Sequence, residues 1–439
     1  MSLTLAASSI VLNSPSPLQR PPIPVVVMQH VEEAAHLHRV RSMLVRAPHV
    51  RLLHLGRFDE RIAAHLDGVA VAGAYGAGLA LQAMERPGPG EVFVAAVGGI
   101  KGHDADRLDR LLAIAEALPA ARAGLLSALG WVSAADLQGI TTALLTSEAS
   151  PWRRQAGLLA CAMHGVNPGP PLAAGLRDAD AGLRATALRV AGRCARADLA
   201  ESCLAALADA DPRCAFEAAR SALLLGDRTE PQAALEALAA DAVSPFHLAA
   251  LQLALKLMPT QRARALLAAL AQDPARARTL IQGIAIAGDA HYVPWLIAQM
   301  QDLKLARVAG EAFAFITGLD LAYLDLDRKP PEGIELGPND DPEDDNVAMD
   351  EDDNLPWPDP DRIDTWWRSN GAHFASGMRY FMGAVPTPAS CLEVLKTGFQ
   401  RQRSAAAEYL ALLTPGTLLF NTAAPTQRQQ RLLGLAMRS

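Results

Sequence analysis

Large apolar residues recur along the middle of the chain at intervals of 30 to 32 residues. Two positions after most of them stands a polar residue that can cap a helix by accepting backbone N–H groups, and an Arg follows soon after. Between these markers, Ala and Leu recur three and four residues apart, which is typical of short amphipathic helices. The pattern therefore predicts a pair of helices in each interval. The apolar markers are Ile114, Leu145, Leu176, Leu207, Leu238, Leu270 and Met300, and the polar residues are Ser147, Asp178, Asp209, Gln272 and Asp302.

The recurring helix pairs predict an all-α protein with the architecture of an α-solenoid. A single short pair cannot bury its own apolar face, so each pair must be covered by the pairs before and after it. The units of about 31 residues resemble HEAT-like repeats in their short form, and they lack the signatures of ankyrin and tetratricopeptide repeats. We expect this array over residues 114–328. The fourth interval departs from the pattern, because Asp241 stands one place late and His247 lies near the expected Arg.

Less regular helical patterns flank the array, and we expect them to cap its two ends. Residues 28–113 form the expected N-terminal helical cap. Residues 362–439 form the expected C-terminal cap, in which residues 388–413 return to the repeat pattern as a closing repeat. Residues 1–27 contain several Pro and have no basic residue before their apolar stretch, so we expect a disordered leader rather than a secretory signal.

An acidic, Pro-rich insertion separates the array from the C-terminal cap at residues 329–361. It contains thirteen acidic residues and no basic residue between Lys329 and Arg362, and nine of the acidic residues fall within residues 340–353. Such a composition favours disorder. Two interpretations stay open: a solvated insertion, or a tether that folds back on the arginine-bearing groove or docks a basic partner.

Composition and charge exclude several classes of function. Apolar residues are mostly Ala and Leu and only 5% of the chain is aromatic, which favours helices over strands. Forty basic against 47 acidic residues give a net charge of −7, which opposes general nucleic-acid binding. The five Cys form no C-x-x-C pair, which is typical of reduced thiols. No stretch approaches the roughly 18 to 20 apolar residues of a membrane helix. We therefore expect a cytoplasmic protein with neither a nucleic-acid nor a membrane partner.

The chemistry available to the chain is sparse. Glu33 and His36 are one helical turn apart, as in di-iron carboxylate bundles, but such a site needs a second motif and further Glu residues that the sequence lacks. They are therefore only weak candidates for metal ligands, and we expect no catalytic residue and no cofactor. Two enzymatic alternatives remain: a metal-dependent enzyme that uses the His-rich N-terminal region, and a HEAT-like lyase or glycosylase.

The recurring Arg allows two interpretations. It bonds the Asp or the helix-end carbonyls of the adjacent repeat, or it lines a groove that holds a ligand. Trp357, inside the insertion, provides an apolar anchor beside the acidic residues. Trp366 and Trp367, after it, either fill the core or form an interface hot spot. The hypothetical partner-binding residues are Arg154, Arg184, Arg213, Arg276, Arg307, Trp357, Trp366 and Trp367.

Several segments resemble a conserved-hypothetical family of proteobacterial proteins with HEAT-like repeats, often encoded beside type VI secretion components. The resemblance lies in residues 29–35 (QHVEEAA), 58–68 (FDERIAAHLDG), 89–93 (PGEVF), 354–359 (NLPWPD) and 398–403 (GFQRQR). The family has no catalytic residues to carry over. The resemblance implies an accessory protein for secreted cargo. We therefore expect a non-enzymatic scaffold that binds a protein partner along its concave face, as an adaptor or chaperone for a type VI effector or spike component.

Overall fold

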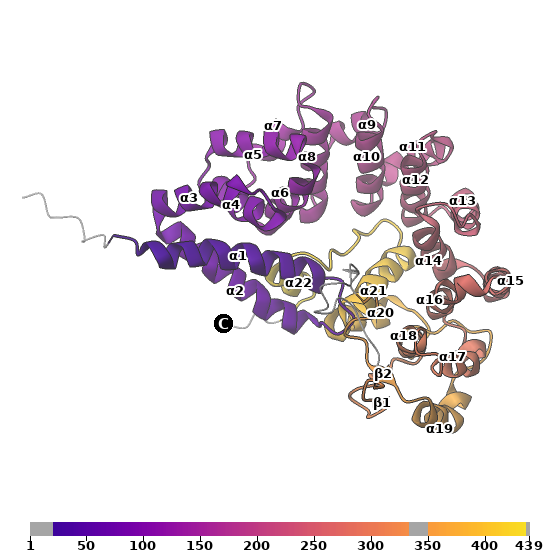
Figure 1. Ribbon diagram of the computed structural model, residues 1–439. Coiled ribbons are helices and arrows are strands. Elements are labelled where there is room, and N and C mark those ends of the chain that lie inside the picture. The colour runs from indigo at the N-terminus through magenta and orange to yellow at the C-terminus, as the bar shows by residue number, and fades with distance from the viewer. Residues whose placement is uncertain (1–20, 333–349, 436–439) are drawn as a thin grey trace, which may run out of the picture.

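The structure, a computed structural model, describes residues 21–332 and 350–435 and is built almost entirely of helices (Figure 1). The described residues contain one two-stranded antiparallel sheet, in which β1 (Asp327–Arg328) pairs with β2 (Trp357–Pro358). The prediction of an all-α protein is confirmed. Short 3₁₀ turns occur at Ala83–Glu85, Ala197–Leu199, Ala206–Ala208, Pro274–Arg276, Ala290–Tyr292 and Gly371–His373.

The N-terminal region begins with a long antiparallel helix pair. Helix α1 starts at Pro24, so residues 24–27 are helical and do not belong to the leader predicted for residues 1–27; residues 1–20 lie outside the described part. Proline suits this first turn because the helix has no use for its missing N–H. The helices of this region are α1 (Pro24–Leu44), α2 (Leu52–Val71), α3 (Gly73–Gln82), α4 (Pro89–Lys101), α5 (Ala105–Ala117) and α6 (Pro119–Trp131).

Helices α4 to α18 form an open arc of two rows (Figure 1). The even-numbered helices line its inside and pack against one another in succession, whereas the odd-numbered helices lie on the outside. The remaining helices of the arc are α7 (Ile140–Leu144), α8 (Pro151–His164), α9 (Pro170–Gly175), α10 (Ala181–Arg193), α11 (Ala200–Ala205), α12 (Pro212–Leu224), α13 (Glu230–Ala240), α14 (His247–Leu257), α15 (Thr260–Leu270), α16 (Ala277–Ala287), α17 (Val293–Gln299) and α18 (Ala306–Thr317).

The inner helices begin at capping residues two or three positions later than the sequence predicted. Asp180 accepts the backbone N–H of Leu183, and Asp211 does the same for Cys214. The expected cap Asp178 instead accepts the N–H of Asp180 at 2.9 Å. It thereby shapes the turn before the helix, because Asp side chains readily bond backbone N–H groups two residues on.

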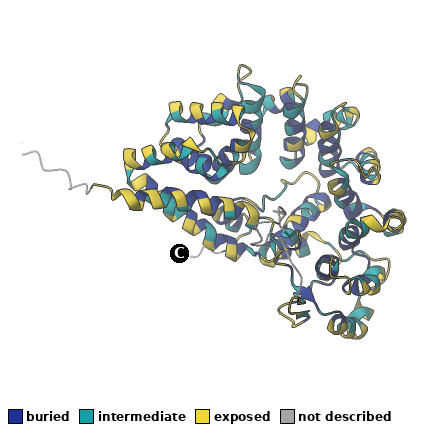
Figure 2. Cartoon of the chain, viewed as in Figure 1, coloured by how far each residue is buried: buried dark blue, intermediate teal, exposed yellow. Residues whose placement is uncertain are grey.

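Buried residues lie on the sides of the helices that face neighbouring helices (Figure 2). They form three apolar clusters, which cover α1 to α8, α8 to α12, and α12 to the C-terminal helices. Small residues allow close approach: a Cβ on Gly124 of α6 would lie 2.2 Å from the carbonyl oxygen of Pro89 in α4. Among the described helices, none is by itself long and apolar enough to cross a membrane; α2 and the segment Gly73–Glu85 pass such a test only together, and they are bent by 115°.

The C-terminal helices are α19 (Pro360–Asn370), α20 (Pro388–Thr397), α21 (Gln400–Leu413) and α22 (Thr426–Leu432). Helices α20 and α21 do pair, but they do not extend the end of the arc as the predicted closing repeat. Helix α21 instead lies inside the arc (Figure 1), where the Tyr409 hydroxyl donates to the carbonyl of Ile286 in α16 at 3.0 Å. At its start, the N–H of Gln400 donates to the carbonyl of Val50, next to α2, at 2.8 Å.

The chain after α21 runs back along the inside of the arc toward its beginning. The N–H of Leu419 donates to the carbonyl of Arg193 at the end of α10. The Arg428 guanidinium donates to the carbonyls of Gly130 (3.0 Å) and Val132 (2.9 Å) at the end of α6. Residues 399–432, which we call the inner segment, therefore connect the two ends of the arc.

Buried polar groups hold the inner segment in place. Arg41 of α1 pairs with Asp59 of α2 at 2.5 Å and also donates to the carbonyls of Ala423 and Ala424, each at 3.1 Å. The N–H of Thr426 donates to the same Asp59 carboxylate at 2.7 Å. Buried polar groups are stabilising only when they are paired in this way, so the contacts select one position for the segment.

Candidate binding site on the inner face

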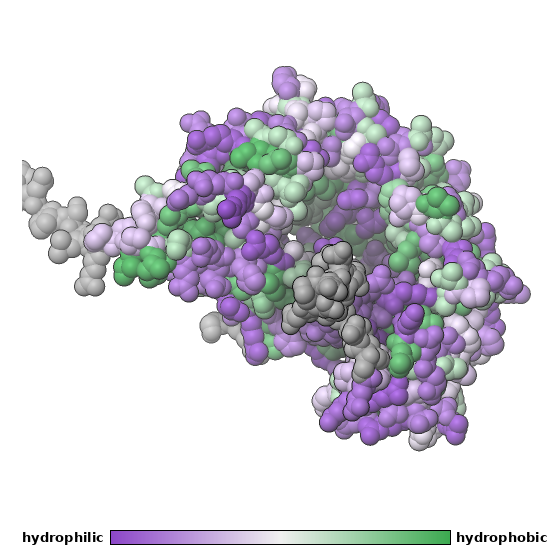
Figure 3. All heavy atoms as spheres, in the orientation of Figure 1, coloured by the Kyte–Doolittle hydropathy of each residue, from purple (hydrophilic) through white to green (hydrophobic). Residues whose placement is uncertain are grey.

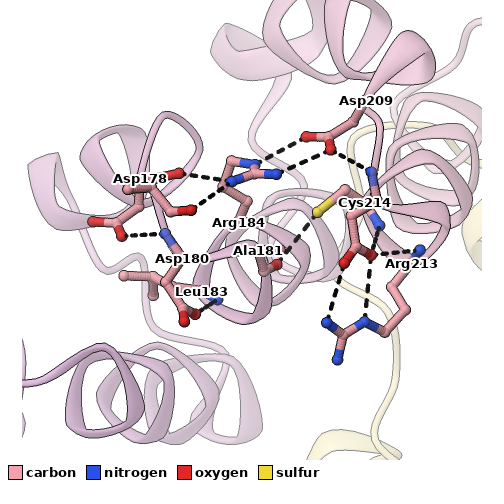
Figure 4. A network of polar contacts seen from close by, with 10 residues as sticks. Asp178, Asp180, Ala181, Leu183, Arg184, Asp209, Arg213 and Cys214 are labelled. Atoms are coloured by element: carbon pink, nitrogen blue, oxygen red, sulfur yellow. Dashed lines mark hydrogen bonds and ion pairs between the residues drawn. The ribbon is translucent and has the colours of Figure 1, made fainter.

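The first-turn arginines of the inner helices form a ladder of ion pairs between neighbouring helix pairs. Arg154 of α8 contacts the Asp178 carboxylate at 2.8 Å, and Arg184 of α10 contacts Asp209 at 2.9 Å. Arg184 also donates to the carbonyls of Asp178 and Ala179 (Figure 4). Hydrogen bonds from the Asp180 N–H and from Arg154 hold the pKa of Asp178 below its usual value. These arginines therefore make the adjacent-repeat contacts that one of the two interpretations predicted.

The ladder is interrupted where the sequence departs from its pattern. Arg213 pairs at 3.2 Å with Asp211 at the start of its own helix (Figure 4), because the following interval carries its Asp one place late. Arg276 donates to the imidazole of His247 at 2.9 Å, and burial together with Arg276 lowers the pKa of that His.

The described end of the acidic insertion folds back on arginines of the arc. Both carboxylate oxygens of Asp350 accept from Arg307 of α18, at 2.6 and 2.8 Å, and Asp352 pairs with Arg278 of α16. The Arg307 guanidinium lies 4.8 Å above the ring of Trp357, which is buried in β2. Residues 350–361 are thus ordered, which corrects the prediction of disorder for this part; residues 333–349 lie outside the described part.

The other two Trp residues also pack into the protein. Trp366 and Trp367 of α19 are half-buried and meet the ring of Phe313 of α18 edge-on, with centroid distances of 5.9 and 6.3 Å. These contacts join α19 to the end of the arc. None of the eight hypothetical partner-binding residues lines either of the two cavities described below.

The weak metal candidates lie apart from any ligand set. Glu33 is half-buried and His36 is exposed on α1. Across residues 21–332 and 350–435, no group of three or more His, Cys, Asp or Glu side chains is arranged to hold a metal ion. His30 and His65 do approach each other, with their Nδ1 atoms 3.0 Å apart.

Two cavities lie on the inner face, one on each side of α21. The Arg278 cavity, of about 660 Å³, is enclosed by α14, α16, α18 and α21. The Arg193 cavity, of about 560 Å³, is enclosed by α1, α6, α10, α12 and residues 419–425 of the inner segment. Both are lined by Val45, Arg46, Ser404 and Glu408, so they meet at α21. Figure 3 shows the hollow at the centre of this face, with hydrophilic and hydrophobic residues around it.

Paired charges of both signs lie where the two cavities meet and in the Arg278 cavity. Lys256 of α14 is buried and pairs with Glu408 of α21 at 2.9 Å. Burial alone would raise the pKa of Glu408, but Lys256 and Arg220 hold it below its usual value. In the Arg278 cavity, burial raises the pKa of Glu311 in spite of the ion pair that it makes with Arg401 at 2.9 Å.

Arg193 and Arg220 line the Arg193 cavity, and sequence reasoning missed them both. Neither guanidinium donates a hydrogen bond to any described residue, and the Nε of Arg193 is buried without a partner there. The carboxylates closest to Arg220 are those of Glu217 at 3.6 Å and Glu408 at 3.9 Å. Burial, with repulsion from Arg220, lowers the pKa of Arg193 to about 10. A usable signal was present, because Arg193 and Lys256 are basic residues in the last turn of inner helices.

Aromatic rings form the opposite wall of the Arg193 cavity. His38 of α1 stacks on Phe93 with the ring centroids 4.1 Å apart, and Trp131 meets Phe93 edge-on at 5.7 Å. Burial lowers the pKa of His38 to about 4, so this ring is neutral near pH 7. The cavity therefore combines two half-buried cations, Arg193 and Arg220, with an uncharged aromatic wall.

No family model matches this sequence, and no curated protein or solved structure matches it either.

Proposed function

We propose that this protein is an α-solenoid of short HEAT-like helix pairs that binds another protein in the hollow of its inner face. The supporting observation is that hollow: two adjoining cavities, bordered by at least six inner helices and lined with buried charged groups. Extended arrays of helix pairs offer such concave surfaces because every pair adds to the same face.

The position of the inner segment narrows the surface available to a partner. The inner segment lies along the concave face, and its contacts with α2 and α16 are buried. A partner therefore enters the two cavities beside α21 rather than lying along the whole concave face. The binding surface is correspondingly small and charged, which favours recognition of a short segment of the partner.

The resemblance to proteins encoded beside type VI secretion components supports a cargo as the partner. In this proposal the protein acts in the cytoplasm as an adaptor or chaperone for a secreted effector or a spike component. It holds the partner without transforming it, because a concave array supplies area and charge rather than reacting groups.

Site-specific photo-crosslinking tests the proposal. A photoreactive residue at Ser404, which lines both cavities, is compared with one at Arg262, whose side chain is 63% exposed on α15 of the outer row. In cells that make the protein together with its secretion components, we expect one defined protein to crosslink from position 404 and not from position 262. Equal crosslinking from both positions, or none from position 404, would contradict the proposal.

Deletion of residues 335–347 tests the acidic insertion separately. This deletion leaves Asp350, Asp352 and Trp357 in place, and these residues belong to the fold. If the insertion contributes to the partner site, the yield of the crosslink from position 404 changes while the unfolding temperature stays the same. An unchanged yield would remove the insertion from the mechanism.

A further inference from the structure

The Arg193 cavity holds positive charge that the described residues do not balance. The charged cluster at this cavity contains four basic side chains, Arg189, Arg193, Arg220 and Lys256, and two carboxylates, Glu217 and Glu408. Glu217 forms an ion pair with Arg189 at 2.5 Å, and Glu408 forms one with Lys256 at 2.9 Å. The cluster therefore keeps an excess of two positive charges, carried by Arg193 and Arg220.

The half-buried Arg193 guanidinium donates no hydrogen bond to any described residue, and its Nε is buried without a partner there. Arg has five N–H donors, and leaving buried donors unsatisfied costs free energy. Arg428, near the end of the inner segment, shows the contrasting case, because its guanidinium donates three hydrogen bonds to backbone carbonyls at the ends of α6 and α8. Arg193 and Arg220 donate no hydrogen bond to a described residue. Arg220 has only the longer ion pairs with Glu217 and Glu408, and both arginines line the cavity.

The other end of the inner face shows what these arginines are suited to hold. There, Arg278 and Arg307 bind the carboxylates of Asp352 and Asp350, which belong to one short stretch of backbone. The Asp352 carbonyl also accepts from Arg307 at 3.0 Å. An acidic peptide stretch is thus already bound by two arginines of neighbouring inner helices, α16 and α18. Arg193 and Arg220 stand on α10 and α12, which are also neighbours.

We propose that the Arg193 cavity binds an acidic segment of a protein partner, with carboxylates of that segment on Arg193 and Arg220. The inference rests on the proposed function and specifies the chemistry of its partner. Two carboxylates match the excess charge, and charge-assisted hydrogen bonds to guanidinium groups are the strongest available to a peptide side chain. The aromatic wall of His38, Phe93 and Trp131 contacts the apolar parts of the same segment.

Binding of synthetic peptides to the full-length protein tests the inference. The probe is a fluorescent pentapeptide of Asp and Glu residues, and its matched control carries Asn and Gln at the same positions; fluorescence anisotropy measures binding at low and high salt. We expect the acidic peptide to bind, the neutral peptide not to bind, and the affinity to fall as the salt concentration rises.

Three variants locate the site. Arg193→Gln and Arg220→Gln should each weaken binding of the acidic peptide by about tenfold or more, because each removes one charge-assisted contact. Arg213→Gln, an exposed Arg paired with its own helix cap, should leave the affinity within about twofold. Ser404→Glu places a negative charge at the cavity wall on an exposed position of α21 and should also weaken binding, without removing any Arg.

Several results would overturn the inference. These are wild-type affinity in both Arg193→Gln and Arg220→Gln, equal binding of the neutral peptide, or full displacement of the peptide by equimolar inorganic phosphate, which would indicate a site for small anions. The outcome is separable from that of the proposed function. A partner that still crosslinks from position 404 in the Arg193→Gln/Arg220→Gln double variant leaves the scaffold function standing and refutes the acidic site. Peptide binding without any crosslinked partner supports the acidic site and refutes the proposed scaffold function.

Discussion

Replacing Arg403 by Met tests whether the inner segment is held inside the arc by its buried polar contacts. Arg403 is 0% exposed, and its guanidinium donates to three oxygens. These are the carbonyl of Leu395 in α20 at 2.7 Å, the side chain of Gln400 at the start of α21, and the side chain of Gln429 in α22 at 2.5 Å. One side chain therefore links three helices.

The expected loss follows from the oxygens that the substitution leaves behind. Met fills much of the space of the aliphatic part of Arg, but it leaves three acceptors buried without a donor. Each unsatisfied group costs about 1 to 3 kcal/mol. The substitution also removes a charged group whose burial is unfavourable, as the lowering of the Arg403 pKa to about 10 indicates. Because this gain offsets part of the loss, we take the lower end of the range, about 1 kcal/mol, for each unsatisfied oxygen. We therefore expect Arg403→Met to destabilise the protein by about 3 kcal/mol.

Urea unfolding and hydrogen exchange measure this effect. We expect a lower midpoint of unfolding, and faster exchange of the amides of α21 and α22 than of α12. The matched control is Arg262→Met, since the Arg262 side chain is 63% exposed and pairs with Glu236 on the surface. That control should change stability by less than about 0.5 kcal/mol.

A triple variant tests how far this polar network extends. Gln400 and Gln429 are also 0% exposed, and their amide groups donate to the backbone carbonyls of Thr422 and Ala424. Adding Gln400→Leu and Gln429→Leu to Arg403→Met removes two unsatisfied oxygens but leaves the Thr422 carbonyl without its two donors. We therefore expect the triple variant not to recover the stability that Arg403→Met loses. Unchanged exchange of α21 and α22 in Arg403→Met would refute the reasoning.

Four other measurements check separate parts of the structure. A double-mutant cycle with Arg184→Gln and Asp209→Asn should give a coupling energy of about 1 kcal/mol, since both side chains are about one-fifth exposed or less; a coupling of zero would remove the ladder from the stability of the arc. Folding lowers the pKa of His38 from 6.5 to about 4, so between these pH values the unfolded state binds a proton that the folded state does not. The free energy of unfolding should therefore decrease as the pH is lowered from 6.5 to 4. At pH 4.5 the decrease should be about 2.5 kcal/mol larger than in a His38→Asn variant measured in the same way. Trp357→Ala should cost about 3 to 5 kcal/mol and expose the chain near residue 350 to proteases, as limited proteolysis would show. Metal analysis of the purified protein should find no stoichiometric iron or zinc; such a metal would instead favour the enzymatic alternative.

The sequence predicted the helices and one ion pair between them correctly, but it misplaced the capping residues. The spacing of Ala and Leu predicted helices, and helices follow one another along the proposed array up to α18, with strand β1 at its end. The contact of Arg184 with Asp209 was among the expected possibilities, and the irregular fourth interval marks the place where the ladder is interrupted at Arg213 and Arg276. Asp178 and Asp209 were misplaced as capping residues because a second Asp stands two positions after each of them, and the spacing alone does not tell which one accepts the helix N–H groups.

The candidate site was not predictable in the same way. Arg193 and Arg220 look like any other basic residues of an amphipathic helix. Their lack of hydrogen bonds to the described residues becomes visible only when their surroundings are known. The arginines chosen from the periodic pattern lie instead at the helix starts, where Arg154, Arg184, Arg213 and Arg307 form ion pairs and Arg276 contacts His247. A residue that recurs in every interval is more often needed by the array itself, because every interval has the same neighbours to contact.

The sequence by itself determined that this chain forms helices, where most of them lie, and which of their faces are apolar, since helix formation depends on residues three and four positions apart. Only the tertiary structure decided that the inner segment returns through the arc, that part of the acidic insertion is ordered, and that two cavities remain beside α21. Those features depend on contacts such as Arg41 with Ala424 and Arg278 with Asp352, whose partners are far apart in the chain. Neither residue type nor spacing marks such partners, because the free energy of each contact depends on burial and geometry that exist only after folding.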